Sequence, residues 1–404
     1  MSNFSLPLLF AMYLMFLLVL NIVYYNYKDK FKKVGVEVAG ISVVWKVIRK
    51  EILPSSKIFR YLRRYSFLLD FLVVFIFLSF LLAVKIYFEN LAGIFKSIIA
   101  AKSPVKGVTV PIIPIIPGIT VSLSILPTLI IVIGLAVLVH EGMHAVVGLI
   151  EGAKIKSFGI ALILIILAPF VEIDENDFTK LKLRSKLRVL SAGVSGNIVL
   201  ALISLILLAC LVPLLFNVHL GLYVAKVVEN TPAAQINLPN SSVIVAINGT
   251  KLDEGMNILD YLFNSRFLFD RLSAFKSKGE VLILTLMDPQ YPYNTYNFTV
   301  IRENITQPIG VILYPYAILE PKSFIARLLG YKLQSFLIWS FALNLGLAAI
   351  NATPLFITDG GKALDEFLKS KYGKQGLKLS KVTQTFFVTV VLINILTSLM
   401  LYIP

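Results

Sequence analysis

Two of the three histidines in this chain lie four residues apart, in the stretch HEGMH at residues 140–144. On a helix, a His-Glu-x-x-His spacing puts His140 and His144 one turn apart on one face, where both imidazoles can bind a single Zn²⁺ ion. Glu141 then lies beside the metal, where it can act as a general base. The spacing therefore predicts a metal site with hydrolytic chemistry.

The alternative for this stretch is purely structural, with two hydrogen-bonded histidines and a buried glutamate joining helices. HEGMH lies within a long apolar run, however. Ionisable residues inside a membrane helix are costly and usually mark a functional site, so the metal interpretation is favoured.

A catalytic zinc site takes three protein ligands and keeps one position open. The third histidine, His219, starts a segment of different character, and the single cysteine, Cys210, lies toward the far end of an apolar stretch. We therefore expect a carboxylate as the third ligand. Asp359 is the candidate, because Pro354 in NATPLFITDGG (residues 351–361) breaks the preceding helix and lets the chain bend inward.

Two alternatives to Asp359 as a ligand remain open at this point. An Asp-Gly pair is common where a chain turns, so Asp359 could simply form a turn after a membrane helix. An acidic cluster could supply the ligand instead, although its charge density is typical of a solvated surface. Its members are Glu172, Asp174, Glu175 and Asp177.

The composition is that of a membrane protein. Of 404 residues, 57% are hydrophobic and only 15% are charged, whereas a soluble domain has about 25% charged residues. Mean hydropathy is +0.82. The single cysteine excludes an intramolecular disulfide and a cysteine-based metal site. We attribute the net charge of +15 to membrane topology and expect no nucleic-acid binding, because the basic residues flank the apolar stretches.

The apolar stretches predict about six membrane-spanning helices, at residues 6–24, 66–88, 121–150, 189–216, 333–357 and 382–403. The first has neither a basic start nor a small-residue cleavage site, so we expect an anchor and not a signal peptide. Residues 155–171 are too short for a spanning helix and predict a hairpin or re-entrant segment covered by protein. The Pro-rich residues 110–119 predict an extended connector.

Residues 219–320 differ from the rest of the chain. Strand-like runs alternate with turns, and one helix-like stretch covers residues 257–272, which predicts an α+β domain. Three basic segments, at 28–64, 180–188 and 362–381, mark the cytoplasmic face, so this domain is expected on the outer face. Four Asn-x-Ser/Thr sequons fit that location: Asn240, Asn248, Asn297 and Asn304.

Several motifs together resemble the site-2 protease family of intramembrane zinc metalloproteases. HEGMH matches the family's His-Glu-x-x-His, NATPLFITDGG its Asn-x-x-Pro-x-x-x-x-Asp-Gly-Gly, and SAGVSGN its Ala-Gly-x-x-x-Asn. APFVEIDE resembles the short membrane-inserted β element of the family. The resemblance covers residues 120–216 and 219–404, whereas the first two spans and the basic segment between them match none of its motifs.

The resemblance implies a polytopic α-helical membrane protein with a short membrane-inserted β element and an inserted α+β, PDZ-like domain outside the membrane. Residues 1–118 would hold two N-terminal spans, 119–218 and 321–404 the two parts of the catalytic membrane core, and 219–320 the inserted domain. Residues 221–228 resemble the ligand-groove strand of a PDZ-like module, but residues 240–242 read Asn-Ser-Ser where such modules usually have Gly-Asp. The expected ligand of this domain is a peptide or a C-terminus; a β-rich spacer that restricts access is the alternative.

For the chemistry, the resemblance implies one Zn²⁺ per chain held by His140, His144 and Asp359, with Glu141 as the general base. The implied substrates are transmembrane proteins, cut within the lipid bilayer by a multi-pass protein of the cell membrane. The active site would lie toward the cytoplasmic half.

Asn197 and Asn351 resemble family positions that could donate hydrogen bonds to the substrate or the oxyanion; either could instead cap or join helices. Two other functions remain as alternatives. One is a membrane zinc protease of the prenyl-protein or heat-shock type, which takes a glutamate ligand from a later helix. The other is a non-catalytic zinc-binding scaffold or a metal transporter.

Overall fold

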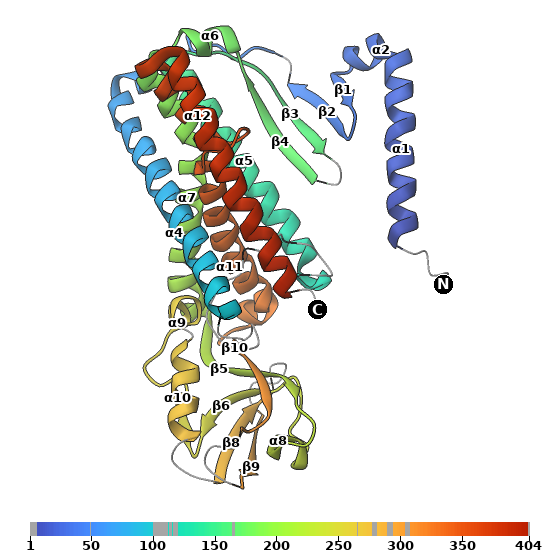
Figure 1. Ribbon diagram of the computed structural model, residues 1–404, viewed down its shortest axis with the longest axis vertical. Coiled ribbons are helices and arrows are strands. Elements are labelled where there is room, and N and C mark those ends of the chain that lie inside the picture. The colour runs from blue at the N-terminus through green and yellow to red at the C-terminus, as the bar shows by residue number, and fades with distance from the viewer. Residues whose placement is uncertain are drawn as a thin grey trace. The chain divides into compact units, whose positions relative to one another are not determined.

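The computed structural model describes residues 6–48, 50–99, 112, 115, 120–163, 166–264, 266–276, 281–288, 294–303 and 308–402. The chain divides into two compact units (Figure 1). The membrane unit comprises Met1–Leu202 and Trp339–Pro404, and the sheet unit comprises Ile203–Ile338.

Long helices dominate the membrane unit. Its helices are α1 (Leu6–Asn26), α2 (Lys28–Lys33), α3 (Lys57–Leu62), the 3-10 helix η1 (Arg63–Leu69), α4 (Asp70–Ile99), η3 (Leu123–Ile125), α5 (Leu126–Glu151), α6 (Glu175–Lys180) and α12 (Asp359–Tyr402). Two further helices, α7 (Leu183–Leu215) and α11 (Phe324–Ala352), begin in one unit and end in the other.

Five helical segments in the described chain are long and apolar enough to cross a membrane: Lys57–Phe95, Leu123–Glu151, Leu183–Leu215, Lys332–Ala352 and Asp359–Leu399. In the most apolar stretch of each segment, at most 33% of the residues are buried. Most of this apolar surface therefore faces outward, as lipid-exposed helices require. The remaining span expected from the sequence, residues 6–24, falls in α1. The apolar part of α1 that the structure describes, Met12–Asn26, is shorter than the five segments above.

The basic segment 362–381 is helical and lies within α12. Gly373 interrupts α12 with a φ of 57° and a ψ of −131°. Gln384 Nε2 donates a hydrogen bond to Asp365 Oδ1 at 2.9 Å. In a straight helix, residues 19 positions apart lie about 28 Å apart. The chain therefore reverses at Gly373, where glycine has no Cβ to oppose the positive φ.

Residues 155–171 belong to a β-hairpin, one of the two possibilities expected from the sequence. Strands β3 (Ile155–Ile163) and β4 (Ile166–Ile173) pair in an antiparallel ladder. A second hairpin, β1 (Val36–Ala39) and β2 (Ser42–Ile48), extends the sheet in the order β1-β2-β3-β4. The sequence did not reveal that basic residues 28–64 contain two strands. Most of the expected connector at 110–119 lies outside the described residues.

The sheet unit is built around one antiparallel sheet with the order β10-β5-β6-β8-β9, and β7 pairs with β6. Its strands are β5 (Phe216–Val227), β6 (Val243–Ile247), β7 (Thr250–Lys251), β8 (Val281–Met287), β9 (Thr295–Ile301) and β10 (Val311–Pro321). Helices α8 (Pro232–Gln235), α9 (Ile258–Phe263) and α10 (Arg266–Lys276) complete it. Leu222, Ile244, Leu268 and Leu284 lie in its core.

The expectation that residues 221–228 form a ligand-groove strand is wrong in this fold. Residues 221–227 lie in β5, which pairs with β10 along one edge and with β6 at Leu222 and Tyr223 along the other. A strand paired on both sides offers few backbone groups to an added peptide. Among the described strands, the outer positions of this sheet belong to β9 and β10.

Candidate metal centre

Helix α5 brings His140, Glu141 and His144 together as the sequence predicts. A proline lies in its first turn, and Gly152 ends it with a φ of 107°, the left-handed conformation that commonly terminates helices. The two imidazole centroids lie 4.8 Å apart. One face of a single helix therefore presents both rings.

Asp359 reaches the same place because the chain turns tightly between α11 and α12. Thr358 Oγ1 donates a hydrogen bond to the carbonyl of Thr353, across the turn. A Cβ on Gly360 would collide with the backbone of Ala352, so the first turn of α12 packs directly on the end of α11. This close approach needs glycine, and it fixes Asp359 at the start of its helix.

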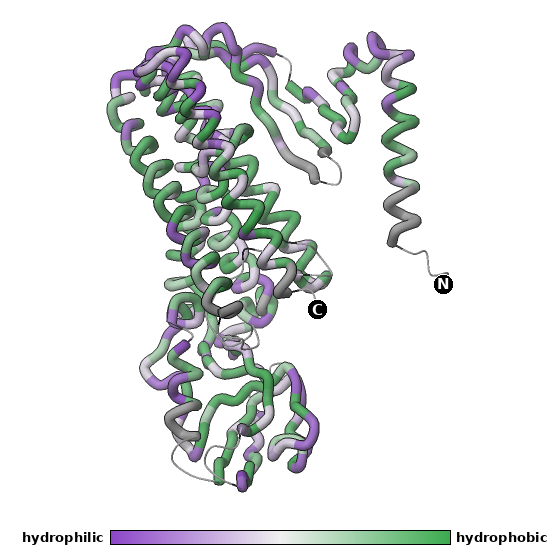
Figure 2. Tube along the Cα trace, in the orientation of Figure 1, coloured by the Kyte–Doolittle hydropathy of each residue, from purple (hydrophilic) through white to green (hydrophobic). Residues whose placement is uncertain are grey.

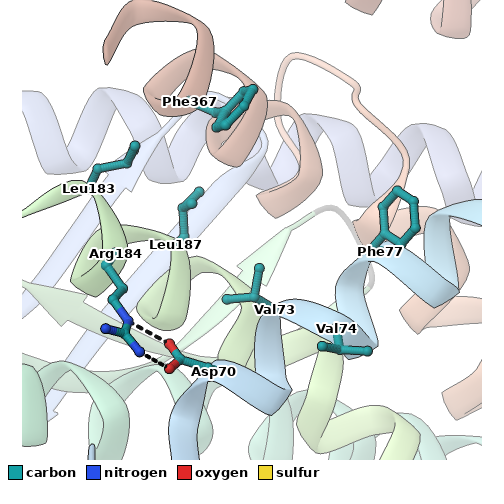
Figure 3. A pocket seen from close by; sticks show the side chains of 8 residues that line it. All are labelled: Asp70, Val73, Val74, Phe77, Leu183, Arg184, Leu187 and Phe367. Carbon is teal, nitrogen blue, oxygen red and sulfur yellow. Dashed lines mark hydrogen bonds and ion pairs between the residues drawn. The ribbon is translucent and has the colours of Figure 1, made fainter. Parts of the chain in front are cut away.

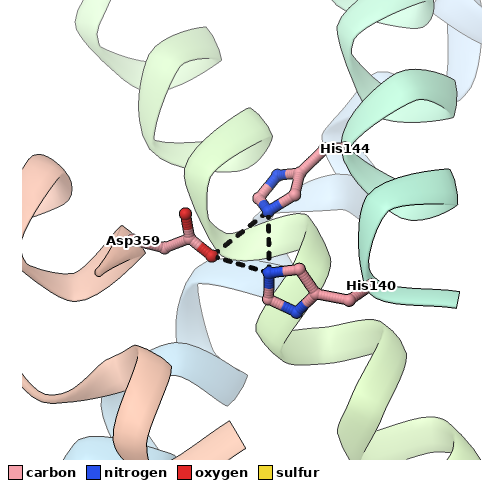
Figure 4. A group of neighbouring side chains, drawn as sticks. All are labelled: His140, His144 and Asp359. Carbon is pink, nitrogen blue, oxygen red and sulfur yellow. Dashed lines mark hydrogen bonds and ion pairs between the residues drawn. The ribbon is translucent and has the colours of Figure 1, made fainter. Parts of the chain in front are cut away.

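Three ligand atoms converge in the structure (Figure 4). Asp359 Oδ2 lies 3.1 Å from both His140 Nε2 and His144 Nε2, and the two Nε2 atoms lie 3.2 Å apart. In a tetrahedral site with metal–ligand bonds of about 2.0–2.1 Å, ligand atoms lie about 3.3 Å from one another. In both spacing and chemistry, the three donor atoms therefore match three of the four ligand positions of such a site.

Burial and charge also fit a cation. His140 and His144 are each 9% exposed, and Asp359 is 6% exposed. Two carboxylates, from Asp359 and Glu141, lie beside two imidazoles in this apolar setting, and a divalent cation would balance their charge. His140, His144 and Asp359 can therefore hold a metal ion.

Glu141 and Asn351 line a cavity of about 360 Å³ at this centre. Glu141 Oε2 accepts a hydrogen bond from the backbone N–H of Val171 at 3.2 Å. The cavity walls come from α5, β4, α6, α7, α11 and α12, and include Val171, Ile173, Glu175, Phe178, Val189, Leu190, Ile357 and Lys362. A substrate group in this cavity would face the predicted base, the metal ligands and the edge of β4.

Asn197, the other predicted amide, does not line this cavity. It is 1% exposed and lies in α7, with Nδ2 at 3.4 Å from His140 Nδ1, on the far side of the imidazole from Asp359. The neighbouring imidazole is held in a similar way, because His144 Nδ1 donates to the carbonyl of Val189 at 2.7 Å. The structure thus places Asn197 against the imidazole of His140 and outside this cavity.

Of the competing acidic cluster, Glu175 lines the cavity, whereas Glu172 and Asp174 form their contacts elsewhere. Glu172 accepts a hydrogen bond from Ser157 and pairs with Lys46 at 3.1 Å. Asp174 caps α6 and pairs with Lys156 at 3.3 Å. Within the described residues, Asp359 is the carboxylate that completes a group of three metal-binding side chains with His140 and His144.

The remaining candidates also lie outside the metal centre. His219 pairs with Glu320 at 3.3 Å in the sheet unit, and Cys210 is exposed on α7. A separate apolar cavity of about 500 Å³ lies between α4, α7 and α12, with the ion pair of Asp70 and Arg184 at its rim (Figure 3).

Val189 was missed from the sequence, and Gly193 was noted there only as part of the Ala-Gly-x-x-x-Asn motif, without a role. A Cβ on Gly193 would lie 2.6 Å from His140 Nε2, so glycine leaves the space that both rings occupy. The signal was available in the spacing, because positions 189, 193 and 197 recur every four residues and so share one helical face.

The family model described as "Peptidase family M50" matches residues 128–396, a span that contains every residue of the metal centre.

Proposed function

Since this chain belongs to peptidase family M50, the site-2 protease family, and is thereby a membrane-embedded metallopeptidase, we propose that it is a zinc-dependent endopeptidase that hydrolyses a peptide bond within or near a transmembrane helix of a substrate protein. The observation that carries the proposal is the convergence of His140, His144 and Asp359 beside Glu141 in a cavity within a unit of membrane-length helices.

The proposed chemistry divides between the metal and the protein. Bound zinc would polarise the scissile carbonyl and lower the pKa of a water molecule. The Glu141 carboxylate takes the proton from the attacking water and passes it to the amide nitrogen of the leaving chain. Asn351 lines the same cavity, and we expect its amide to hydrogen-bond the peptide. His140, His144 and Asp359 hold the ion and keep these groups in register.

The substrate must present an extended backbone, because a helix keeps its amides in internal hydrogen bonds. Strand β4 offers an edge for such a peptide. The N–H of Val171 points away from β3, toward Glu141. Pro169 lies two residues earlier, so its backbone nitrogen faces the same edge of the strand. Pro169 therefore removes no hydrogen bond from the β3–β4 ladder. Within the described chain β4 pairs with β3 alone, so the proposed substrate strand adds along the edge that carries Val171.

Membrane orientation is part of the proposal. Polar residues gather at the end of the membrane unit where α6 lies and α12 reverses (Figure 2). The basic segments around residues 57–64, 180–188 and 362–381 belong to this end, which the positive-inside rule makes cytoplasmic. Helix α7 starts in one of these segments, and its 33 residues are long enough to cross the bilayer. The sheet unit then follows on the outer face, where an extended peptide could pair with β10.

Cleavage of a model transmembrane substrate by the purified chain, with metal content measured in parallel, tests the function. Glu141→Gln is expected to keep the metal and to lose about 10²–10⁴-fold in turnover. Asp359→Asn is expected to lose metal, whereas Asp365→Asn, a carboxylate variant further along α12, is expected to keep it. Unchanged cleavage by Glu141→Gln would exclude the proposed base, and metal-loaded protein without cleavage would favour a scaffold.

A further inference from the structure

One face of α7 forms the wall behind both histidines of the metal centre. Val189, Gly193 and Asn197 are four residues apart, and all three are buried. Val189 contacts His144, Asn197 contacts His140, and Gly193 leaves the gap between them. In each imidazole, Nε2 faces Asp359 and lies against Gly193, whereas Nδ1 faces Val189 or Asn197.

The far nitrogen decides which tautomer each ring adopts. An imidazole that binds a metal through Nε2 carries its proton on Nδ1, and that N–H needs an acceptor. His144 has its acceptor in the carbonyl of Val189, at 2.7 Å. For His140 the group within reach of Nδ1 is the side-chain amide of Asn197, at 3.4 Å.

The amide of Asn197 has an unused acceptor. Its Oδ1 is buried and has no hydrogen-bond partner within the part of the chain that the structure describes. A buried amide oxygen without a partner is costly. Rotation of the side-chain amide by half a turn exchanges Oδ1 and Nδ2, which differ little in shape, and brings the oxygen to His140 Nδ1.

We propose that Asn197 is a positioning residue for the metal centre, which accepts the Nδ1–H of His140 and thereby keeps the Nε2 lone pair directed at the ion. This role differs from donation to the substrate or the oxyanion, since Asn197 lies behind the ring and outside the cavity that Glu141 and Asn351 line. The inference rests on His140 and His144 holding a metal, but not on which peptide is cut.

Metal affinity tests the inference without a protease assay. The full chain in detergent is stripped with a chelator, and its affinity for Co²⁺ is measured by competition with a chromophoric chelator. Asn197→Ala is expected to weaken Co²⁺ binding by about 10–100-fold, the usual effect of removing a partner of a metal-bound histidine. Asn197→Asp keeps an acceptor and is expected to bind within a few-fold of the wild type.

The chain offers a matched control in Asn344. This asparagine is fully buried in α11 and likewise has an Oδ1 without a partner among the described residues, but its amide donates to Ser340 within its own helix. Asn344→Ala is expected to leave Co²⁺ affinity and the ligand-field spectrum unchanged. Equal losses in the two alanine variants would overturn the inference, as would wild-type affinity in Asn197→Ala.

The outcomes also separate this inference from the proposed function. Wild-type metal affinity with impaired cleavage in Asn197→Ala would place Asn197 on the substrate side and leave the peptidase proposal intact. Weakened affinity in Asn197→Ala together with inactive wild-type protein would support the positioning role and contradict the peptidase proposal.

Discussion

At the scale of single residues, the metal centre depends on a position that has no side chain. A Cβ on Gly193 would lie 2.6 Å from His140 Nε2, and also too close to His144. Gly193→Ala therefore has to displace at least one imidazole. We expect it to weaken Co²⁺ binding at least as much as Asn197→Ala, by 10-fold or more.

The control for this prediction is a glycine elsewhere in the same unit. Gly346 lies within α11, and an added Cβ there meets nothing within 4 Å. Gly346→Ala should keep the metal affinity and leave the thermal unfolding temperature equal to or above that of the wild type, because alanine favours helix. Metal affinity equal to the wild type in Gly193→Ala would show that the rings do not occupy this space in the bound state.

The sequence could predict those residues of the metal centre whose role follows from the chemistry of the residue type. His140, Glu141 and His144 follow from one spacing on one helix, and Asp359 from the scarcity of other ligands. The two asparagines could not be told apart in this way. Asn351 lines the cavity while Asn197 lies behind a ligand, and that difference depends on how α7 and α11 rotate about their axes, which packing decides.

At the scale of secondary-structure elements, the edge of β4 makes a specific prediction. Val171→Pro removes the N–H that faces Glu141 and leaves the β3–β4 ladder intact, just as Pro169 already does two residues earlier. We expect this variant to keep its metal and to lose most of its cleavage of a transmembrane substrate, because the N–H that donates to Glu141, and that is available to an added strand, is gone.

Phe170→Pro is the matched control for this strand. Phe170 pairs with Gly159 on the inner edge, so proline there removes a hydrogen bond of the ladder itself and should destabilise the hairpin. Metal content and thermal unfolding separate the two variants. Full cleavage by Val171→Pro would exclude strand addition at this position.

The pairing of β5 with β10 also has a pH dependence that can be tested. Hydrogen bonds from Asn217 and from His219 lower the pKa of Glu320 below its usual value. A carboxyl whose pKa is lowered in the folded state stabilises the fold above its unfolded pKa, about 4.3, and this contribution is lost as the pH falls through the folded pKa.

Glu320→Gln should remove that contribution. At pH 7 we expect the variant to unfold at a lower temperature than the wild type. The loss in free energy of unfolding should be less than about 1 kcal/mol, since the pair is partly exposed. The difference should shrink as the pH falls below 4. Thermal unfolding of both full chains between pH 7 and pH 3.5 measures it, and a difference that grows on acidification would contradict this assignment.

Element boundaries show where the sequence was insufficient. Apolar length located the long helices, and alternation located the strands of the sheet unit. The segment 28–64 was interpreted only by its charge, yet it forms β1 and β2. The residues of β2, SVVWKVI, are mostly types that are enriched in strands, and they pair with β3. The reversal at Gly373 was also not predicted, since Gly373 and Gly376 in a lysine-rich stretch are compatible with a loop, a kink or a turn.

At the scale of the whole molecule, the polar end of the membrane unit is held together by charges. Arg188 pairs with Glu151 at 2.9 Å and with Asp70 at 2.8 Å, and Arg63 Nε donates to the carbonyl of Ile150 at 2.7 Å. These contacts join α4, α5 and α7 at the same end as the basic segments. Their position is consistent with an aqueous interface, because charges paired at a helix end avoid the cost of burial in hydrocarbon.

Cysteine labelling can test the orientation that this end implies. Cys210 is the only cysteine, so Cys210→Ser gives a clean background. Lys371 lies by the reversal of α12, and Lys251 lies on β7 of the sheet unit; both are exposed. With a membrane-impermeant maleimide on intact cells, we expect Lys251→Cys to be labelled and Lys371→Cys to be protected until the membrane is opened. The reverse pattern would put the metal centre nearer the outer face, and the proposed substrates would then have to enter with the opposite topology.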